Sequence, residues 1–242
     1  MTEPMTFRHT LVFDLDGTLI ESDRDLARAA NRLLAERDRP ALTLDRVRSF
    51  VGDGARKLVE RCFEATGGLP ASLDDLTARF IALYEENIAD ETTAFDGVHE
   101  TLTALRAKGH RLAVCTNKPE TATRRLLDIL GLADYFEDLV GGDSLPVRKP
   151  DPGHILALLD RMQVSPKDAV MVGDSGNDIF AGRDAGLKTI LVTFGYCRTP
   201  HEKLPADAMV DHFSQIPDIL AQFSQPHRKA GTNALDSAAP AP

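Results

Sequence analysis

Short runs of apolar residues recur along the chain and alternate with segments of helical periodicity. The runs are rich in Val, Leu and Ile and show little polar alternation, which is the pattern of parallel strands covered on both faces. We therefore predict buried strands at residues 10–15, 111–116, 137–142, 168–173 and 189–194.

Amphipathic segments separate the later strands. One of them begins with Pro119 and ends at Gly131, which are typical helix start and stop residues. Similar patterns predict helices near residues 97–109, 151–164 and 178–186. Alternation of strands with helices is typical of a doubly wound parallel sheet, so the predicted fold class is α/β.

The interval after the first strand is longer than this alternation requires. A strand–helix–strand unit needs about 30 residues, whereas the second predicted strand begins only at residue 111. Amphipathic helical segments fill the gap. We therefore predict a helical cap domain at residues 21–94, inserted into an α/β core formed by residues 1–20 and 95–225. Residues 226–242 are small, polar and Pro-containing, and we predict a disordered tail there.

Composition narrows the classes of function. The chain has 242 residues, 43% hydrophobic and 27% charged, which is typical of a soluble globular protein. Its formal net charge of −9 disfavours nucleic-acid binding, because a phosphate backbone would be repelled. No apolar run approaches the roughly 18 residues that span a bilayer, so no membrane partner is expected. The three cysteines lack zinc-like or redox-like spacing and suit a reducing cytoplasm. We expect a monomer or a small homo-oligomer.

Polar residues gather where the predicted strands end. In an open α/β sheet, ligands bind at the carboxyl ends of the strands. Each of these residues has an ordinary explanation when taken alone, as a turn residue, a helix cap or a surface lysine. Their joint occurrence at successive strand ends predicts one shared site. The residues are Asp14, Asp16, Thr116, Asn117, Lys149, Asp174 and Asp178.

This set of groups favours phosphoryl transfer from a small phosphorylated metabolite. Carboxylates that share a pocket repel one another unless a cation joins them, and hard oxygen ligands favour Mg²⁺. An aspartate can attack a phosphoryl group to form an aspartyl-phosphate, which makes Asp14 a candidate nucleophile. Asp16 is a candidate general acid and base. Lys149 and the Thr116 hydroxyl can hold the phosphoryl oxygens.

Four motifs in this chain resemble those of the haloacid dehalogenase (HAD) superfamily of phosphatases. They are "DLDGT" at residues 14–18, "TN" at 116–117, Lys149 in "KPDP", and "GDSGND" at 173–178. The resemblance implies a HAD-like Rossmannoid core with a small helical cap that closes over the active site. It also implies a Mg²⁺-dependent phosphomonoester hydrolase that acts through an aspartyl-phosphate intermediate.

The resemblance also implies a role for each acid. Asp14 would be the nucleophile and a metal ligand, and Asp16 the general acid and base, with its backbone carbonyl on the metal. Asp174 would be the remaining side-chain metal ligand. Asp178 would support Asp174 or orient Lys149. The implied phosphate-binding residues are Thr116, Asn117 and Lys149.

Within the superfamily, the motifs most resemble those of phosphoglycolate phosphatases, whose substrate carries a carboxylate besides its phosphate. We predict that the glycine-rich stretch "VGDGARK" at residues 51–57 meets this carboxylate, because N–H groups at a helix N-terminus attract anions. The candidate residues are Gly52, Gly54 and Arg56. The alternative is that the two glycines only shape a turn and that Asp53 caps the following helix.

Other functions are compatible with parts of this pattern. Another HAD phosphatase, pyrophosphatase-like or specific for a sugar phosphate, or a phosphoglucomutase would use the same core. A signalling receiver also phosphorylates an Asp beside a Lys and a Thr, but it retains the phosphate and lacks a large helical cap. A catalytically silent binding protein would not need the intact set of acids. Measured turnover separates these classes.

Overall fold

The computed structural model describes residues 8–224, so the predicted tail at residues 226–242 lies outside it. At its centre is a six-stranded sheet in the order β5-β4-β1-β6-β7-β8, in which every neighbouring pair is parallel. The strands are β1 (Thr10–Phe13), β4 (Arg111–Cys115), β5 (Asp138–Val140), β6 (Ala169–Gly173), β7 (Lys188–Val192) and β8 (Ala208–Val210). The predicted α/β fold with a parallel sheet is confirmed, and β8 is an additional strand.

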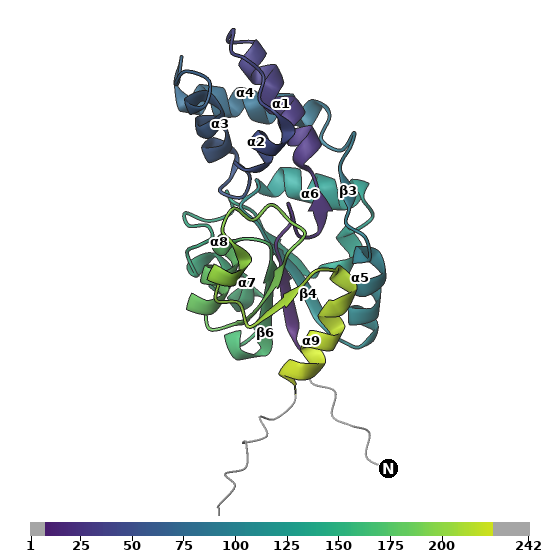
Figure 1. Ribbon diagram of the computed structural model, residues 1–242. Coiled ribbons are helices and arrows are strands. Elements are labelled where there is room, and N and C mark those ends of the chain that lie inside the picture. The colour runs from purple at the N-terminus through teal and green to yellow at the C-terminus, as the bar shows by residue number, and fades with distance from the viewer. Residues whose placement is uncertain (1–7, 225–242) are drawn as a thin grey trace, which may run out of the picture.

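Helices cover both faces of the sheet (Figure 1). Side chains of β1 alternate between the two faces, as the period of a strand requires. Leu11 and Phe13 belong to the core beneath one set of helices, whereas Val12 belongs to the core on the other face. The first set is α5 (Val98–Ala107), α6 (Glu120–Ile129) and α9 (Ile216–Phe223), and the second is α7 (Gly153–Arg161) and α8 (Gly176–Asp184).

A separate group of helices lies beyond the carboxyl ends of the strands (Figure 1). Two short strands, β2 (Ile20–Glu21) and β3 (Thr93–Ala94), pair in antiparallel fashion where the chain leaves the core and returns to it. The helices lie between them, within the segment predicted as the cap. They are α1 (Asp23–Ala35), α2 (Leu44–Arg48), α3 (Ala55–Glu64) and α4 (Leu73–Glu86).

The four helices α1 to α4 are called the cap below, and they pack on one another through apolar stripes. In α1, Leu26, Ala30, Leu33 and Leu34 are all buried, as expected for residues spaced along one face of a helix. Of the helices within residues 8–224, none is long and apolar enough to cross a lipid bilayer.

A buried carboxylate fixes the two connections between cap and core. Asp25, at the start of α1, accepts hydrogen bonds from the backbone N–H and the hydroxyl of Thr92, at 2.9 and 2.7 Å. The Glu91 N–H also donates to it. The outgoing helix is therefore tied to the returning segment at the base of the cap.

Candidate active site

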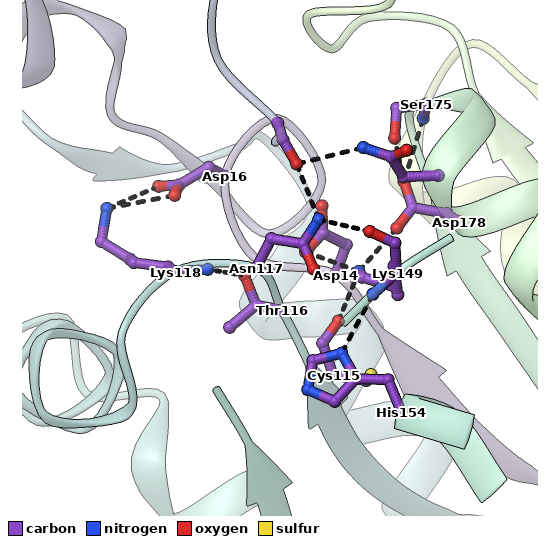
Figure 2. A network of polar contacts seen from close by, with 12 residues as sticks. Asp14, Asp16, Cys115, Thr116, Asn117, Lys118, Lys149, His154, Ser175 and Asp178 are labelled. Carbon is purple, nitrogen blue, oxygen red and sulfur yellow. Dashed lines mark hydrogen bonds and ion pairs between the residues drawn. The ribbon is translucent and has the colours of Figure 1, made fainter. Parts of the chain in front are cut away.

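Lys149 connects three of the polar groups at the strand ends. Its ammonium lies 2.9 Å from Asp14 Oδ1 and 2.6 Å from Asp178 Oδ1, and it donates to the Cys115 carbonyl at 2.5 Å (Figure 2). Burial opposes a charge on this side chain, but the two aspartates outweigh it and raise the pKa of Lys149. The buried lysine is therefore cationic and neutralises part of the acidic cluster.

Three of the four predicted acids converge. Carboxylate oxygens of Asp14, Asp174 and Asp178 lie within 4.8 Å of one another. Burial raises the pKa of Asp14 to about 6. Burial, followed by the charges of Asp178 and Asp14, also raises the pKa of Asp174. Asp178 was predicted either to support Asp174 or to orient Lys149. Its ion pair with Lys149 favours the second role.

The acidic cluster has the character of a Mg²⁺ site. Its donors are hard carboxylate oxygens from three buried side chains. Burial, followed by the charges of neighbouring carboxylates, raises the pKa values of Asp14 and Asp174, and a divalent cation among these oxygens would lower them again. Asp14, Asp174 and Asp178 therefore fit Mg²⁺, which prefers oxygen ligands. The Asp16 carboxylate lies outside this cluster, so its predicted contribution is limited to its backbone carbonyl.

A close backbone crossing shapes the site beside Asp174. Gly17 has φ +88°, and a Cβ there would lie 2.5 Å from Asp174 Oδ2. A Cβ at Gly195 would lie 2.3 Å from the Gly17 carbonyl oxygen. The segments at Gly17 and Gly195 can therefore approach Asp174 and each other this closely only because both residues lack a side chain.

The Asp16 carboxylate points away from the acidic cluster. Figure 2 shows it directed towards Lys118, on the opposite side from Asp14 and Lys149. The Lys118 ammonium lies 3.1 Å from both Asp16 oxygens, and the Ser22 hydroxyl donates to Asp16 Oδ1 at 2.5 Å. Sequence reasoning gave neither Lys118 nor Ser22 a role, although Lys118 directly follows the second motif.

Thr116 and Asn117 lie in the loop after β4, where they were predicted. The Thr116 side chain bonds within this loop, whereas the Asn117 side chain bonds to two other loops. The Thr116 hydroxyl is buried and accepts a hydrogen bond from the Lys118 N–H at 3.2 Å. The Asn117 amide donates to the Gly52 carbonyl at 3.0 Å and to the Lys149 carbonyl at 2.9 Å. Both N–H bonds of this side chain are thus used to join loops, which leaves none of them for a phosphate.

The cap loop predicted to select the substrate reaches the site only in part. Gly52 and Gly54 line the cavity beside Asp14. Arg56 does not, because its guanidinium lies at the surface and pairs with Asp74 at 3.1 Å. We therefore withdraw Arg56 as a substrate contact. The N-terminus of α3, which begins after Gly54, has no side-chain cap.

Asp53 holds the cap loop against the core instead of capping α3. Its carboxylate accepts from the Asn177 amide and from Arg198, each at 2.6 Å, and pairs with Arg61 at 2.5 Å. Although burial opposes ionisation, these hydrogen bonds lower the pKa of Asp53 to about 2. The alternative of a helix-capping Asp53 is wrong, and the carboxylate joins the cap to the fourth motif.

A small cavity lies between cap and core above Asp14. Its volume is about 50 Å³. Core loops supply its polar lining and cap helices most of its apolar lining. The lining residues from the core loops are Asp14, Asp16, Thr116, Asn117, Lys118 and Pro119, and those from the cap include Leu26, Val51, Leu58, Phe80, Ile81 and Tyr84.

His154 supports the loop that carries Lys149. Its Nδ1 accepts a hydrogen bond from the Lys149 backbone N–H at 3.3 Å, and its Nε2 lies 3.0 Å from the Gly141 carbonyl, to which it can donate. This pattern requires the neutral ring. Burial, followed by the charge of Lys149, lowers the pKa of His154 from 6.5 to about 4.

We predict that His154 makes the fold sensitive to acid. Its folded-state pKa lies below its unfolded value, so its contribution is complete above pH 6.5 and is lost as the pH falls towards 4. Over that interval the stability advantage of the wild type over His154→Gln should shrink by about 2–3 kcal/mol. Urea unfolding of both proteins between pH 7.5 and 4 measures this difference, and other titrating groups cancel in the comparison. A pH-independent difference would contradict the assignment.

Comparison with known proteins gives consistent matches over most of the chain. A family model described as haloacid dehalogenase-like hydrolase matches residues 11–192. A phosphoglycolate phosphatase of Caulobacter vibrioides is 43% identical over 211 residues, which are 86% of this chain and 89% of that protein. A phosphoglycolate phosphatase of Rhodospirillum rubrum is 44% identical over 222 residues, covering 89% of this chain and 92% of the relative.

Among solved structures, the chain is similar to one described as a predicted phosphoglycolate phosphatase from Haemophilus somnus. The TM-score is 0.84 with 34% sequence identity, and the match covers 89% of this chain and 99% of the other. The similarity therefore extends over both the sheet and the helical group above it.

Proposed function

The chain belongs to the haloacid dehalogenase-like hydrolase family and is a phosphatase, and we propose that it hydrolyses 2-phosphoglycolate to glycolate and phosphate. The observation that carries this proposal is the small cavity whose described lining brings one cation, Lys118, beside the acids Asp14 and Asp16. Such a cavity suits a small ester with a second negative charge. The names of the two relatives described above agree with this substrate.

We infer a two-step reaction. One oxygen of Asp14 attacks phosphorus, and the bond from phosphorus to the glycolate oxygen breaks as Asp16 transfers a proton to that oxygen. Asp16 then takes a proton from water, whose oxygen attacks the phosphorus. The bond between Asp14 and phosphorus breaks, which releases phosphate and restores the carboxylate.

The surrounding residues stabilise this transfer. Lys149 lies 2.9 Å from Asp14, and its ammonium can bind a phosphoryl oxygen where negative charge develops. The Thr116 hydroxyl is a second candidate contact at the same strand edge. Mg²⁺ held by Asp14 and Asp174, with Asp178 beside them, would supply positive charge to bring together the anionic nucleophile and the anionic ester.

The cavity volume favours a small leaving group. At about 10–15 Å³ for each water-sized position, a cavity of about 50 Å³ holds roughly four such positions. The carboxymethyl part of 2-phosphoglycolate has only two carbons and two oxygens, so it is the kind of compact leaving group that a small cavity favours. A sugar phosphate has more atoms to place and would have to extend into the second cavity of about 240 Å³, which Asp16 and Asp174 also line.

We predict a clear preference in a substrate panel. Phosphate release should be measured from 2-phosphoglycolate, pyrophosphate, glucose phosphates and an aryl phosphate, with Mg²⁺ and with EDTA. The kcat/KM for 2-phosphoglycolate should exceed the others at least about tenfold, or about 1.4 kcal/mol of transition-state discrimination. EDTA should abolish release from every ester.

The other outcomes have definite meanings. A flat profile, or a different preferred ester, would move the chain to another phosphatase of the same family. Release that persists in EDTA would contradict the Mg²⁺ requirement. Absence of turnover on every ester would favour a phosphorylated binding module.

A further inference from the structure

Lys118 is a buried cation that the reaction above does not use. Its side chain is only 5% exposed, and the residue lines the cavity beside Asp14. Burial opposes its charge, but the Asp16 carboxylate outweighs that effect and raises the pKa of Lys118. A charged ammonium is therefore held at this wall of the cavity.

Tyr84, from cap helix α4, is the second polar group at the same wall. The Lys118 ammonium lies 4.5 Å from the centre of its ring. The Tyr84 hydroxyl is buried and makes no hydrogen bond of normal geometry to the residues that the structure describes, although the Lys118 ammonium is close enough to act on its pKa. A buried hydroxyl without a partner is unfavourable. A ligand that accepts a hydrogen bond there would satisfy it.

The cavity offers an anionic ligand one cationic group. Of the described side chains that line it, Asp14 and Asp16 are acidic, Lys118 alone is cationic, and most of the cap's contribution is apolar. Lys149, the other buried cation, is already engaged by Asp14 and Asp178. Lys118 pairs only with Asp16 among the described carboxylates, at 3.1 Å, so an anionic group on the leaving part of the substrate can share this cation with Asp16.

We propose that Lys118 and Tyr84 form the subsite for the substrate carboxylate, an inference that rests on the proposed hydrolysis of 2-phosphoglycolate. The Lys118 ammonium pairs with the carboxylate, and the Tyr84 hydroxyl donates a hydrogen bond to it. One methylene separates the leaving oxygen of this substrate from its carboxylate carbon. The proton donor and the carboxylate-binding cation must therefore be neighbours, as Asp16 and Lys118 are at 3.1 Å.

The arrangement makes selection depend on closure of the cap. Lys118 belongs to the core loop after β4, whereas Tyr84 belongs to α4 of the cap. A carboxylate between them would link the two parts of the molecule. Gly52 and Gly54 would then shape the cavity, while side-chain recognition falls to Lys118 and Tyr84.

The test compares 2-phosphoglycolate with its neutral amide, 2-phosphoglycolamide, which has the same shape. The quantity measured is the ratio of their kcat/KM values. In Lys118→Met this ratio should fall at least about tenfold, and in Tyr84→Phe about three- to tenfold, as expected for a lost charged hydrogen bond. Lys57→Met is the matched control, because Lys57 is an exposed cap lysine paired with Glu60, and its ratio should stay unchanged.

The ratio separates recognition from an indirect effect on Asp16. If Lys118 only positioned Asp16, both substrates would lose activity equally, and the unchanged ratio would overturn the proposal. If Lys118→Met is inactive on both, calorimetric Kd values for the two ligands in Asp14→Asn and Asp14→Asn/Lys118→Met give the same ratio. A wild-type ratio near one would reject the proposed substrate itself, which is a distinct result.

Discussion

Replacing Asp14 with Asn should lower kcat for phosphate release by at least ~10³-fold, as expected when a covalent nucleophile is removed. The amide keeps the size and shape of the side chain but cannot attack phosphorus. Lys149 keeps its ion pair with Asp178 and its hydrogen bond to the Cys115 carbonyl, so the surrounding loops should stay in place.

The same variant should not lose stability in EDTA. Burial disfavours ionised Asp14 more than its ion pair with Lys149 favours it, as its pKa of about 6 indicates. A neutral amide avoids the burial of this charge, so the Tm of Asp14→Asn without metal should equal or exceed that of the wild type. Adding Mg²⁺ should raise the Tm of the wild type more than that of the variant, because the variant lacks one anionic ligand.

Two further variants make this assignment specific. Asp184→Asn makes the same chemical change at an exposed position on α8 and should leave turnover unchanged. Asp16→Asn, given acetyl phosphate, whose leaving group needs no proton, should accumulate a phosphorylated protein detectable by mass spectrometry. Asp14→Asn should form no such adduct. Substantial turnover in Asp14→Asn, or an adduct on it, would rule out Asp14 as the nucleophile.

The parallel sheet was predictable because each strand carries its own evidence. Runs such as Thr10–Phe13 and Ala169–Gly173 are apolar on both faces, and the predicted strand ends differ from the observed ones by at most two residues. β8 and α9 do not stand out in the same way. Ala208–Val210 has only three residues, which is too few for a period to be recognised in the sequence.

The acidic cluster was predictable for a topological reason. Carboxyl ends of parallel strands meet at one edge, so Asp14, Asp174 and Lys149 had to approach one another once the strands were placed. Contacts between the cap and the core do not follow from this rule. Tyr84 lies on the buried side of α4 and gives no sign in the sequence that it lines a cavity. Its proximity to Lys118 depends on how the cap is oriented above the core.

Replacing Lys149 with Met should lower both activity and stability. Its side chain is only 1% exposed and pairs with Asp14 and Asp178. Met occupies a similar volume but leaves these buried carboxylates without a protein cation. We expect the free energy of unfolding to fall by about 3–5 kcal/mol in EDTA, and kcat/KM to fall at least ~10³-fold with loss of a phosphoryl contact. Urea unfolding and phosphate release measure the two effects.

Lys188→Met is the matched control, since Lys188 also pairs with an aspartate at 2.6 Å but is 55% exposed. Loss of that pair should change stability by less than about 1 kcal/mol. If Lys149 acts by neutralising buried acids, Lys149→Met/Asp178→Asn should be more stable than Lys149→Met alone, because one unpaired charge is gone. Mg²⁺ should also restore part of the lost stability in Lys149→Met. Two outcomes would contradict a stabilising role for the buried ion pairs. One is that Lys149→Met is no more destabilising than Lys188→Met. The other is that Asp178→Asn, added to Lys149→Met, lowers the free energy of unfolding further.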